Sequence, residues 1–377
     1  MITPRENLLR ALNHEVPAWL PVAGHCDPYN RPSRDDMPPE LEAALGEVRW
    51  RGEATVTLSR YLGLDIMDWY GMPVRITRRR VTVEQHTEGD VTTRRWTTPE
   101  GELHETSRAC RDSTGAVSSN WTEHPVKSAA DLPSLAAIFE DEFIEPDPDG
   151  VESVRRRREL IGDDGLVMGT MPGMPLGMLV RVYSGVAALA YMWQDAREDL
   201  LDLFAIMERN YMQRLAVGAQ TDVDAIVSVD DTSTTAISPA MFEACNVDLT
   251  NTRARAAHAA GKHYFHHSCG LIRDLLPIYR ETEMDAVHAF TIPPMGDVTV
   301  VQGRAALGDR ITIIAGLQQL SGPMDDRPAV RASIHRMIDE ARPWDHFILN
   351  ATAYPHRTME QTRFVVECCR EVGGGAG

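Results

Sequence analysis

The residues with the clearest chemical potential are a histidine and a cysteine two positions apart, in His267-Ser268-Cys269-Gly270. They stand where the apolar run 262–267 ends and a helical run begins. Imidazole nitrogen and thiolate sulfur suit zinc, and side chains two residues apart at a strand end can converge on one ion with a third group from elsewhere. A small buried cysteine before a glycine turn, beside a packed core histidine, would give the same spacing. The motif therefore predicts either a metal or thiol site or a purely structural turn.

Composition limits the possible partners and compartment. The formal net charge of −17 argues against nucleic acid or an anionic membrane as partners, because phosphate groups are bound by clustered Lys and Arg. Six cysteines in 377 residues do not make a disulfide framework, and no stretch has the roughly 18 consecutive apolar residues of a membrane span. We expect a soluble, cytoplasmic protein, with a homodimer as the commonest oligomer.

Lysine usage excludes two enzyme classes. The lysines are Lys127 and Lys262, and neither follows an apolar strand, where a Schiff-base amine would have to point. A lysine-dependent aldolase and a pyridoxal phosphate enzyme are therefore not expected. No Gly-rich stretch ends in the lysine that a phosphate-binding P-loop needs.

Apolar strand-length runs alternate with helical runs along the chain and would position these residues. Strands are expected at 18–23, 62–69, 165–170, 225–230, 263–267, 285–289, 311–315 and 346–350. Helices are expected to begin at the capping box Thr3-Pro4-Arg5-Glu6, and over 197–217 and 238–260. This order predicts an α/β fold, a (β/α)8 TIM barrel in a single domain over 1–377, with an antiparallel β insertion near residues 72–125 and a flexible tail at 373–377.

A barrel of this kind carries its active site at the C-terminal ends of its strands. The polar residues that follow the expected strands form one candidate mouth: His25, Cys26 and Asp27; Asp230 and Asp231; His267 and Cys269; Gln318; Asn350 and Thr352. Asp230-Asp231 ends an otherwise apolar strand, so at least one of the two carboxylates is expected to face the barrel mouth and act in catalysis. Alternatively, both carboxylates only cap the following loop. The substrate-binding candidates are His25, Asp27, Gln318, Asn350 and Thr352.

Several motifs follow one another in a recognisable order: Thr3-Pro4-Arg5-Glu6 to Pro17, Leu62-Gly63-Leu64-Asp65, Thr98-Pro99-Glu100-Gly101, His124-Pro125-Val126-Lys127-Ser128, Val229-Asp230-Asp231, Ile237-Ser238-Pro239, His267-Ser268-Cys269-Gly270 and Ala315-Gly316-Leu317. Over nearly the whole chain this order resembles the uroporphyrinogen decarboxylase superfamily. It is more similar to the branch of cobalamin-linked methyltransferases, which move methyl groups between a corrinoid protein and a thiol such as coenzyme M. The resemblance implies the barrel fold, zinc and a corrinoid carried by a separate protein.

Two departures limit the resemblance. True uroporphyrinogen decarboxylases continue the first strand with arginines that hold substrate carboxylates, whereas this chain continues Pro21-Val22-Ala23-Gly24-His25, so a tetrapyrrole substrate is not expected. In the thiol methyltransferases zinc is held by His-x-Cys and a second Cys after the last strand, and the matching position here is Thr352. Because the first strand of a barrel closes beside the last, Cys26 or His25 is expected to complete the set.

Three functions stay open at this point. The first is a zinc methyltransferase built on His267 and Cys269. The second is a metal-free decarboxylase or lyase, in which Asp230 or Asp231 moves protons while Arg31 or Arg181 binds a carboxylate. The third is a barrel that binds a small molecule or a corrinoid partner without chemistry. Metal analysis and carbon dioxide release would separate them.

Overall fold

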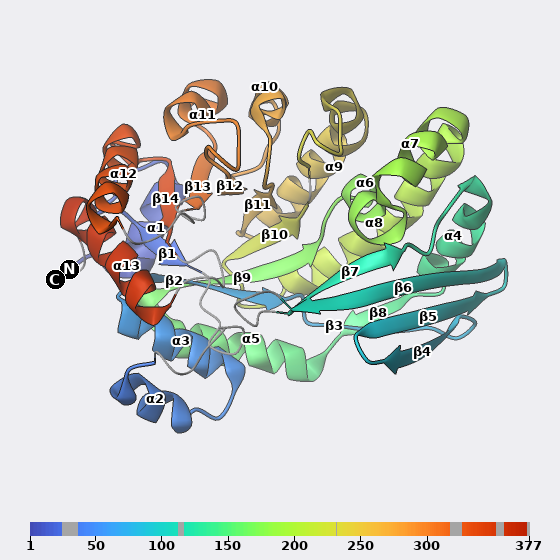
Figure 1. Ribbon diagram of the computed structural model, residues 1–377, viewed down its shortest axis with the longest axis horizontal. Coiled ribbons are helices and arrows are strands. Elements are labelled where there is room, and N and C mark those ends of the chain that lie inside the picture. The colour runs from blue at the N-terminus through green and yellow to red at the C-terminus, as the bar shows by residue number, and fades with distance from the viewer. Residues whose placement is uncertain (25–36, 112–116, 231, 317–325, 352–357, 375–377) are drawn as a thin grey trace.

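A closed parallel barrel forms the centre of the computed structural model, which describes residues 1–24, 37–111, 117–230, 232–316, 326–351 and 358–374 (Figure 1). Its strand order is β1-β14-β13-β12-β11-β10-β9-β2. The strands are β1 Val22–Gly24, β2 Asp65–Gly71, β9 Gly165–Pro172, β10 Ala225–Val229, β11 His263–His267, β12 Ala286–Phe290, β13 Thr312–Gly316 and β14 Phe347–Asn350. The predicted (β/α)8 barrel is confirmed.

The first strand begins later than predicted. Residues 18–20 do not pair with the neighbouring strands, because their backbone groups have other partners. The side chain of Asn7 binds the backbone of Ala18 and Trp19 at 2.7 and 3.0 Å, and Leu20 N donates to Gly373 O at 2.8 Å. Gly373, placed in the predicted tail, therefore ends the last helix and contacts the start of the barrel.

Helices surround the barrel on its outside (Figure 1). They are α1 Pro4–Leu12, α2 Pro39–Gly46, α3 Arg51–Leu62, α4 Leu132–Glu140, α5 Pro148–Ile161, α6 Pro175–Met178, α7 Gly185–Asp195, α8 Arg197–Ala219, α9 Pro239–Ala259, α10 Leu276–Arg280, α11 Val300–Leu307, α12 Arg327–Glu340 and α13 Met359–Gly373, with 3-10 turns at Ala129–Asp131, Gly162–Asp164 and Arg273–Leu275 and a π-helix, η3, at Leu179–Tyr183. The predicted capping box is present: Thr3 Oγ1 accepts from Glu6 N at 3.2 Å, and Glu6 Oε2 accepts from Thr3 N at 2.9 Å.

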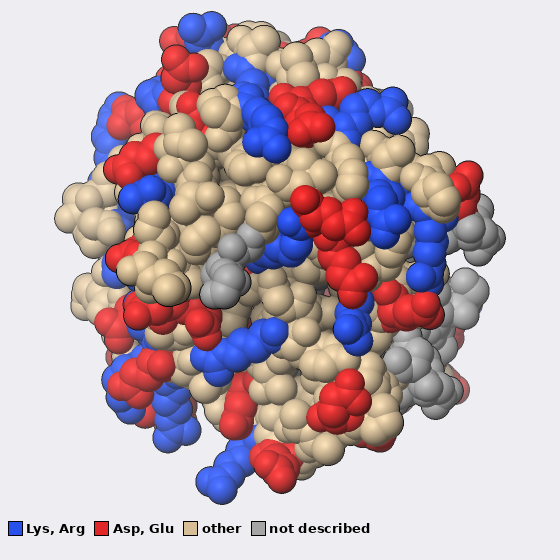
Figure 2. Space-filling model, turned by 90° about the vertical axis from the view of Figure 1, so that its left-hand side faces the viewer, with Lys and Arg blue, Asp and Glu red and all other residues tan. Residues whose placement is uncertain are grey.

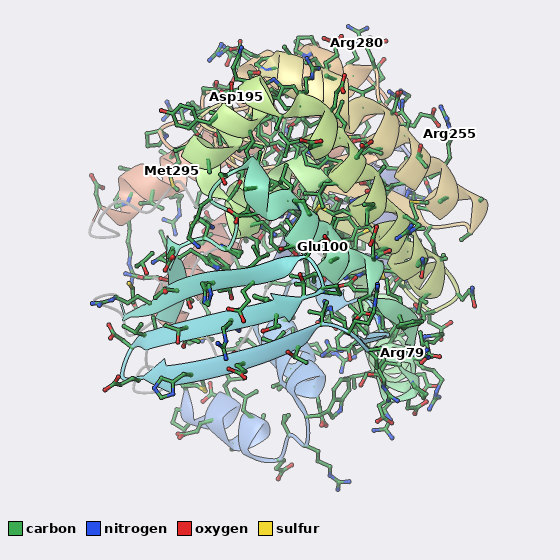
Figure 3. The ribbon with its side chains drawn as sticks, turned by 90° about the vertical axis from the view of Figure 1, so that its right-hand side faces the viewer. Arg79, Glu100, Asp195, Arg255, Arg280 and Met295 are labelled. Atoms are coloured by element: carbon green, nitrogen blue, oxygen red, sulfur yellow. The ribbon has the colours of Figure 1, made fainter. Side chains whose placement is uncertain are left out.

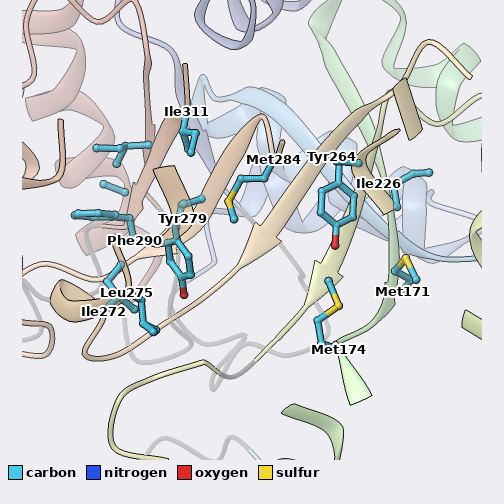
Figure 4. Packing of buried hydrophobic residues seen from close by; sticks show 14 of the residues in the cluster. Met171, Met174, Ile226, Tyr264, Ile272, Leu275, Tyr279, Met284, Phe290 and Ile311 are labelled. Atoms are coloured by element: carbon cyan, nitrogen blue, oxygen red, sulfur yellow. The ribbon is translucent and has the colours of Figure 1, made fainter. Parts of the chain in front are cut away.

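Two apolar layers follow from the alternation of side chains along each strand. Val227 and Phe265 belong to the cluster inside the barrel, which Leu8 and Leu12 of α1 complete at the N-terminal end. Ile226 and Tyr264, one residue earlier on the same strands, belong to the second cluster, which packs against the surrounding helices (Figure 4). Polar residues on the outward layer therefore lie under the helices and away from the barrel interior.

The predicted insertion is a four-stranded antiparallel sheet in the order β4-β5-β6-β7, which lies to one side of the barrel (Figure 3). Its strands are β4 Thr82–Glu88, β5 Val91–Thr98, β6 Gly101–Arg111 and β7 Val117–Glu123, and the predicted turns at Gly89 and Glu100 join the first three. A separate antiparallel pair, β3 Val74–Thr77 and β8 Phe143–Pro146, flanks it. After β7, His124 and Val126 contact the backbone of Val182 and Tyr183 in the π-helix, and the chain re-enters the barrel at β9.

The surface carries both signs of charge. Figure 2 shows acidic and basic side chains interspersed on the face that includes α12 and α13, where Arg327 pairs with Glu360 and Arg331 with Glu371. In the described part of the chain, no helix combines the length and apolar character needed to cross a bilayer.

The packing of α1 gives the first prediction. Leu8 is fully buried in the inner cluster, so Leu8→Ala should lower the free energy of unfolding by about 2–5 kcal/mol, because it leaves a cavity under the barrel. Denaturant unfolding followed by circular dichroism measures this. Val16→Ala, at a position 57% exposed, is the matched control and should change stability by less than about 0.5 kcal/mol. Equal stability of the two variants would contradict a structural role for α1 in closing the barrel.

Candidate active site at the barrel mouth

The predicted mouth is described only in part. Asp230, His267, Cys269 and Asn350 are described, whereas six other candidates lie outside the described residues: His25, Cys26, Asp27, Asp231, Gln318 and Thr352. Arg31 lies outside them as well. β1 pairs with β14 through Ala23 and Asn350, so the closure of the first strand on the last is confirmed. The roles assigned to all these residues stay predictions.

A cluster of two imidazoles and an indole occupies the mouth. His267 ends β11, and its Nδ1 lies 2.9 Å from Nδ1 of His288, its register partner on β12. The two rings stack with centroids 5.0 Å apart. Trp69 of β2 completes the cluster, with its ring centroid 5.9 Å from that of His267 and 4.5 Å from that of His288. Of these three residues, the sequence pattern predicted His267 alone. His288 and Trp69 lie on other strands, and the way in which the strands pair determines that they contact His267.

Electrostatics keep the His267 ring neutral. Burial is the main cause that lowers the pKa of His267 to about 4; the Asp230 carboxylate opposes the shift, while His266 and Arg181 add to it. A neutral imidazole carries a proton on one nitrogen and a lone pair on the other, which is the form that binds metals or accepts protons. The contact between the two Nδ1 atoms requires one of them to carry a proton and donate it to the other.

Cys269 lies two residues beyond His267, on a turn that glycine makes possible. Gly270 has φ +90°, and a Cβ at this position would lie 2.7 Å from Ser233 Oγ. Gly270 N donates to Thr291 Oγ1 at 3.1 Å, and Leu271 N donates to Ser233 Oγ at 3.1 Å. The predicted glycine turn is confirmed, and it holds the partly exposed Cys269 beside the end of β11.

Asp230 points into the layer between the strands and the helices. It is 2% exposed; one carboxylate oxygen accepts from Met174 N, and the other accepts from Ser228 Oγ at 2.6 Å and lies 3.1 Å from His266 Nδ1. Burial by itself would raise the pKa of Asp230, but the charge and hydrogen bond of His266, with smaller contributions from Arg253 and Ser228, hold it well below its usual value. Both oxygens of Asp230 therefore have partners in the framework around the mouth. The catalytic role predicted for Asp230 stays a prediction.

The contacts of Asp230 continue in both directions through buried polar groups. Ser228 Oγ accepts from Arg253 Nη1 at 2.9 Å, and Arg253, which is fully buried, donates through Nε to Glu208 at 2.8 Å. On the other side His266 Nε2 lies 3.3 Å from Thr232 Oγ1, which contacts the hydroxyl of Tyr279 at 2.8 Å. We call this chain from Glu208 to Tyr279 the Asp230 network. It ties α8, α9 and α10 to the ends of β10 and β11.

Asn350 lies at the C-terminal end of β14, beside the first strand of the barrel. It is the last residue of β14, is 7% exposed, and pairs in register with Ala23 of β1 and Gly316 of β13. A substrate-binding role for its amide stays a prediction.

A metal site is complete nowhere within the described residues. No group of three or more His, Cys, Asp or Glu side chains comes close enough there to hold an ion. The described donors at the mouth are the neutral imidazole of His267 and the thiol of Cys269, with the His288 ring in contact with His267. The neutral imidazole of His267 offers the lone pair that zinc needs, whereas the thiol of Cys269 would lose its proton on binding the metal. A third ligand would have to come from outside the described residues.

Comparisons with known proteins extend over the whole barrel. The family model "Uroporphyrinogen decarboxylase (URO-D)" matches residues 121–372. The structure of a methyltransferase from Methanosarcina mazei is similar over 98% of this chain and 99% of that one, with 15% identity and a TM-score of 0.62, which shows a shared fold. A D-psicose 3-epimerase (12% identity, 60% of this chain and 85% of that one, TM-score 0.32) and the E. coli 3-keto-D-glucoside 4-epimerase YcjR (10% identity, 67% and 97%, TM-score 0.30) are too distant to carry an argument. No curated protein matches the chain.

The neutral state of His267 gives a prediction on pH. Its folded-state pKa is depressed, so its contribution to stability is fully present above about pH 6.5 and is lost as the pH falls toward 4. The drop of the pKa from 6.5 to about 4 corresponds to about 3 kcal/mol. NMR titration of the histidine rings in metal-free protein, assigned with His267→Gln, should find a midpoint near pH 4 for His267. A midpoint near 6.5 would contradict the assigned environment.

A second prediction concerns Asp230. Asp230→Asn should lower the free energy of unfolding by about 3 kcal/mol, because it removes the charge that faces the buried His266. Asp202→Asn, on the exposed side of α8, is the matched control and should unfold like the wild type. An Asp230→Asn protein of wild-type stability that has lost turnover would instead support a catalytic role for this carboxylate.

Proposed function

We propose that this chain, which belongs to the uroporphyrinogen decarboxylase family, is a methyltransferase-like enzyme that moves a methyl group to a small thiol or a related nucleophile. The observation that carries the proposal is the pairing at the barrel mouth of His267, kept neutral by burial, with Cys269 two residues later. The end-to-end fold similarity to a methyltransferase supports it. Family membership and fold alone would leave the reaction open, since one barrel serves many chemistries.

Zinc is the metal that we propose for this site. His267 and Cys269 would hold it, with Cys26 as the third ligand and His25 as the alternative. Three protein ligands leave one open position, as catalytic zinc requires. When bound, zinc would lower the pKa of a substrate thiol enough to keep it as a thiolate at neutral pH.

The residues of the chain prepare the thiolate for attack. The Asp230 network fixes the end of β11 and thereby the orientation of His267, while Trp69 covers one side of the imidazole pair with an apolar ring. The thiolate sulfur then forms a bond to the methyl carbon, and the bond from that carbon to the donor breaks with its electron pair staying on the donor. We propose that the donor is a corrinoid carried by a separate protein.

A metal-free carboxy-lyase is the second candidate. The direct contact between His267 Nδ1 and His288 Nδ1 at 2.9 Å favours it, because two imidazoles that share a proton can move it to a substrate carbon without a metal. Asp231 is the remaining carboxylate of the predicted pair for this role, since the oxygens of Asp230 are occupied. Such an enzyme would release carbon dioxide from a small carboxylate.

Elemental analysis combined with a transfer assay tests the proposal. The purified protein should contain about one zinc per chain and should move the methyl group of methylcobalamin to 3-mercaptopropionate. The double variant His267→Ala, Cys269→Ala should lose the zinc and lower the transfer rate by at least about a hundredfold. Cys110→Ser, at an exposed cysteine of β6, is the matched control and should keep both.

Two outcomes would contradict the methyltransferase. Full zinc occupancy in the double variant would place the metal elsewhere. Carbon dioxide release from small carboxylates without any methyl transfer would favour the lyase, and a protein with neither activity that still binds a corrinoid would be a binding barrel.

A further inference from the structure

The strand β4 forms an edge of the inserted sheet that has no partner within the described residues. The sheet has the order β4-β5-β6-β7, so β4 pairs with β5 on one side only (Figure 1). Every residue of Thr82–Glu88 is exposed. A free edge presents a row of N–H and C=O groups that can bind another strand, so proteins usually block such an edge with Pro, Lys, a bulge or a covering segment.

β4 has none of these blocks in the part of the chain that the structure describes. Its sequence contains neither Pro nor Lys, and its ladder with β5 runs without a register shift over the whole strand. The opposite edge of the sheet differs, because the ladder between β6 and β7 is irregular between Thr106 and Ser107. β4 is therefore the edge of this sheet that is suited to bind another strand.

The hairpin geometry identifies the backbone groups that face outward. β4 is joined to β5 by the two-residue turn 89–90. The pair of residues that flanks such a turn is hydrogen-bonded, and hydrogen-bonded and non-hydrogen-bonded pairs then alternate along the ladder. The N–H and C=O groups of Val83, Gln85 and Thr87 consequently point away from β5, toward the free edge.

The charges along this segment indicate which strand the edge would bind. Residues 78–80 are three arginines, and Glu84, Glu88 and Asp90 follow, so residues 78–90 have no formal net charge in a chain of −17. A second copy that runs antiparallel brings the basic start of one segment to the acidic end of the other. A parallel copy would place like charges beside each other and would be repelled.

One antiparallel register suits both the backbone and the side chains. It is centred on Gln85, so that the outward groups of Val83 in one copy face those of Thr87 in the other. The same register places Glu84 opposite His86, whose ring can donate a hydrogen bond to the carboxylate. In this register no two like charges of β4 lie directly opposite each other.

The charged side chains near the edge stay accessible although they have partners in their own chain. Glu84 accepts from Arg95 at 2.6 Å and is 71% exposed. At the two ends of the segment, the side chain of Arg80 is 58% exposed and that of Asp90 is 55% exposed. They can therefore contact a second copy without leaving their present positions.

We propose that two copies of this chain associate through β4, whose free edges pair antiparallel across a twofold axis at Gln85 and join the two inserted sheets into one continuous sheet. The interface is isologous, so it closes on itself and yields a dimer. Pairing along a single strand buries less surface than a permanent dimer does, and the dimer is therefore weak. The residues of this surface lie outside the candidate active site, so the proposal does not depend on the proposed function.

Analytical ultracentrifugation of the full chain tests the proposal. Between chain concentrations of about 1 and about 200 µM, the wild type should change from monomer to dimer with a dissociation constant on the order of 10 µM. Amide hydrogen exchange, measured at both ends of this range, localises the contact. The N–H groups of Val83, Gln85 and Thr87 should exchange more slowly at the higher concentration, whereas those of β7 should not change.

Two variants weaken the edge in different ways. Gln85→Pro removes an N–H group from each copy at the centre of the interface and none that faces β5, so it should weaken the dimer by about ten- to a hundredfold. His86→Glu places carboxylates opposite each other and should weaken it by about tenfold. His104→Glu makes the same change on β6, away from the edge, and should associate like the wild type.

A mixture of variants tests the register. Glu84→Lys and His86→Glu each disturb the opposite pair in their own dimers, but an equimolar mixture brings Lys and Glu side chains together across the axis. The mixture should therefore recover most of the wild-type association. Circular dichroism confirms that each variant is folded, and His86→Glu carries the test if Gln85→Pro is not.

Four results would overturn the proposal: a wild type that stays monomeric at about 200 µM, a dimer that Gln85→Pro and His86→Glu leave unchanged, a mixture of Glu84→Lys and His86→Glu that does not recover, or assemblies larger than a dimer. A concentration-dependent dimer that both variants weaken, and that the mixture recovers, would support it.

Discussion

The buried carboxylate of Asp230 holds together the three chain segments that shape the barrel mouth. It accepts a hydrogen bond from Met174 N after β9 and one from Ser228 on β10, and it faces His266 on β11, while its own backbone N–H donates to His267 O at 3.1 Å. A charge buried to this degree is tolerable only because every one of these partners is in place. The ends of β9, β10 and β11 are therefore fixed relative to one another before any ligand arrives, and Cys269 takes its position from that framework.

Two adjacent histidines on β11 show how the strand divides structure from chemistry. His266 faces outward, is fully buried and joins the Asp230 network, whereas His267 faces the mouth and contacts His288 and Trp69. Because successive side chains of a strand point to opposite faces, the carboxylate of Asp230 contacts the ring of His266 and not the ring of His267. Burial instead sets the state of His267 and lowers its pKa, which leaves a neutral ring beside Cys269. The segment that leaves the inserted sheet contacts the π-helix, since His124 Nδ1 lies 3.0 Å from Val182 O.

The sequence could predict what depends on local pattern. Apolar runs of strand length located all eight barrel strands, the Thr3 and Glu6 pair located the first helix, and the glycine after Cys269 predicted the turn. It could not predict features that depend on strand register. His288 reaches His267 only because β12 pairs with β11 in one register and continues through an irregularity after His288. The direction of the Asp230 side chain likewise depends on which face of β10 lies under the helices.

The central claim is that His267 and Cys269 bind the sulfur of a small thiol at the barrel mouth. A crystal structure of the protein soaked with 3-mercaptopropionate, with anomalous scattering used to locate sulfur and zinc, tests it most directly. We expect the ligand sulfur beside His267 and Cys269, on a zinc ion. A carboxylate seated against His267 and His288, with the sulfur pointing away from Cys269, would contradict the account and favour the carboxy-lyase.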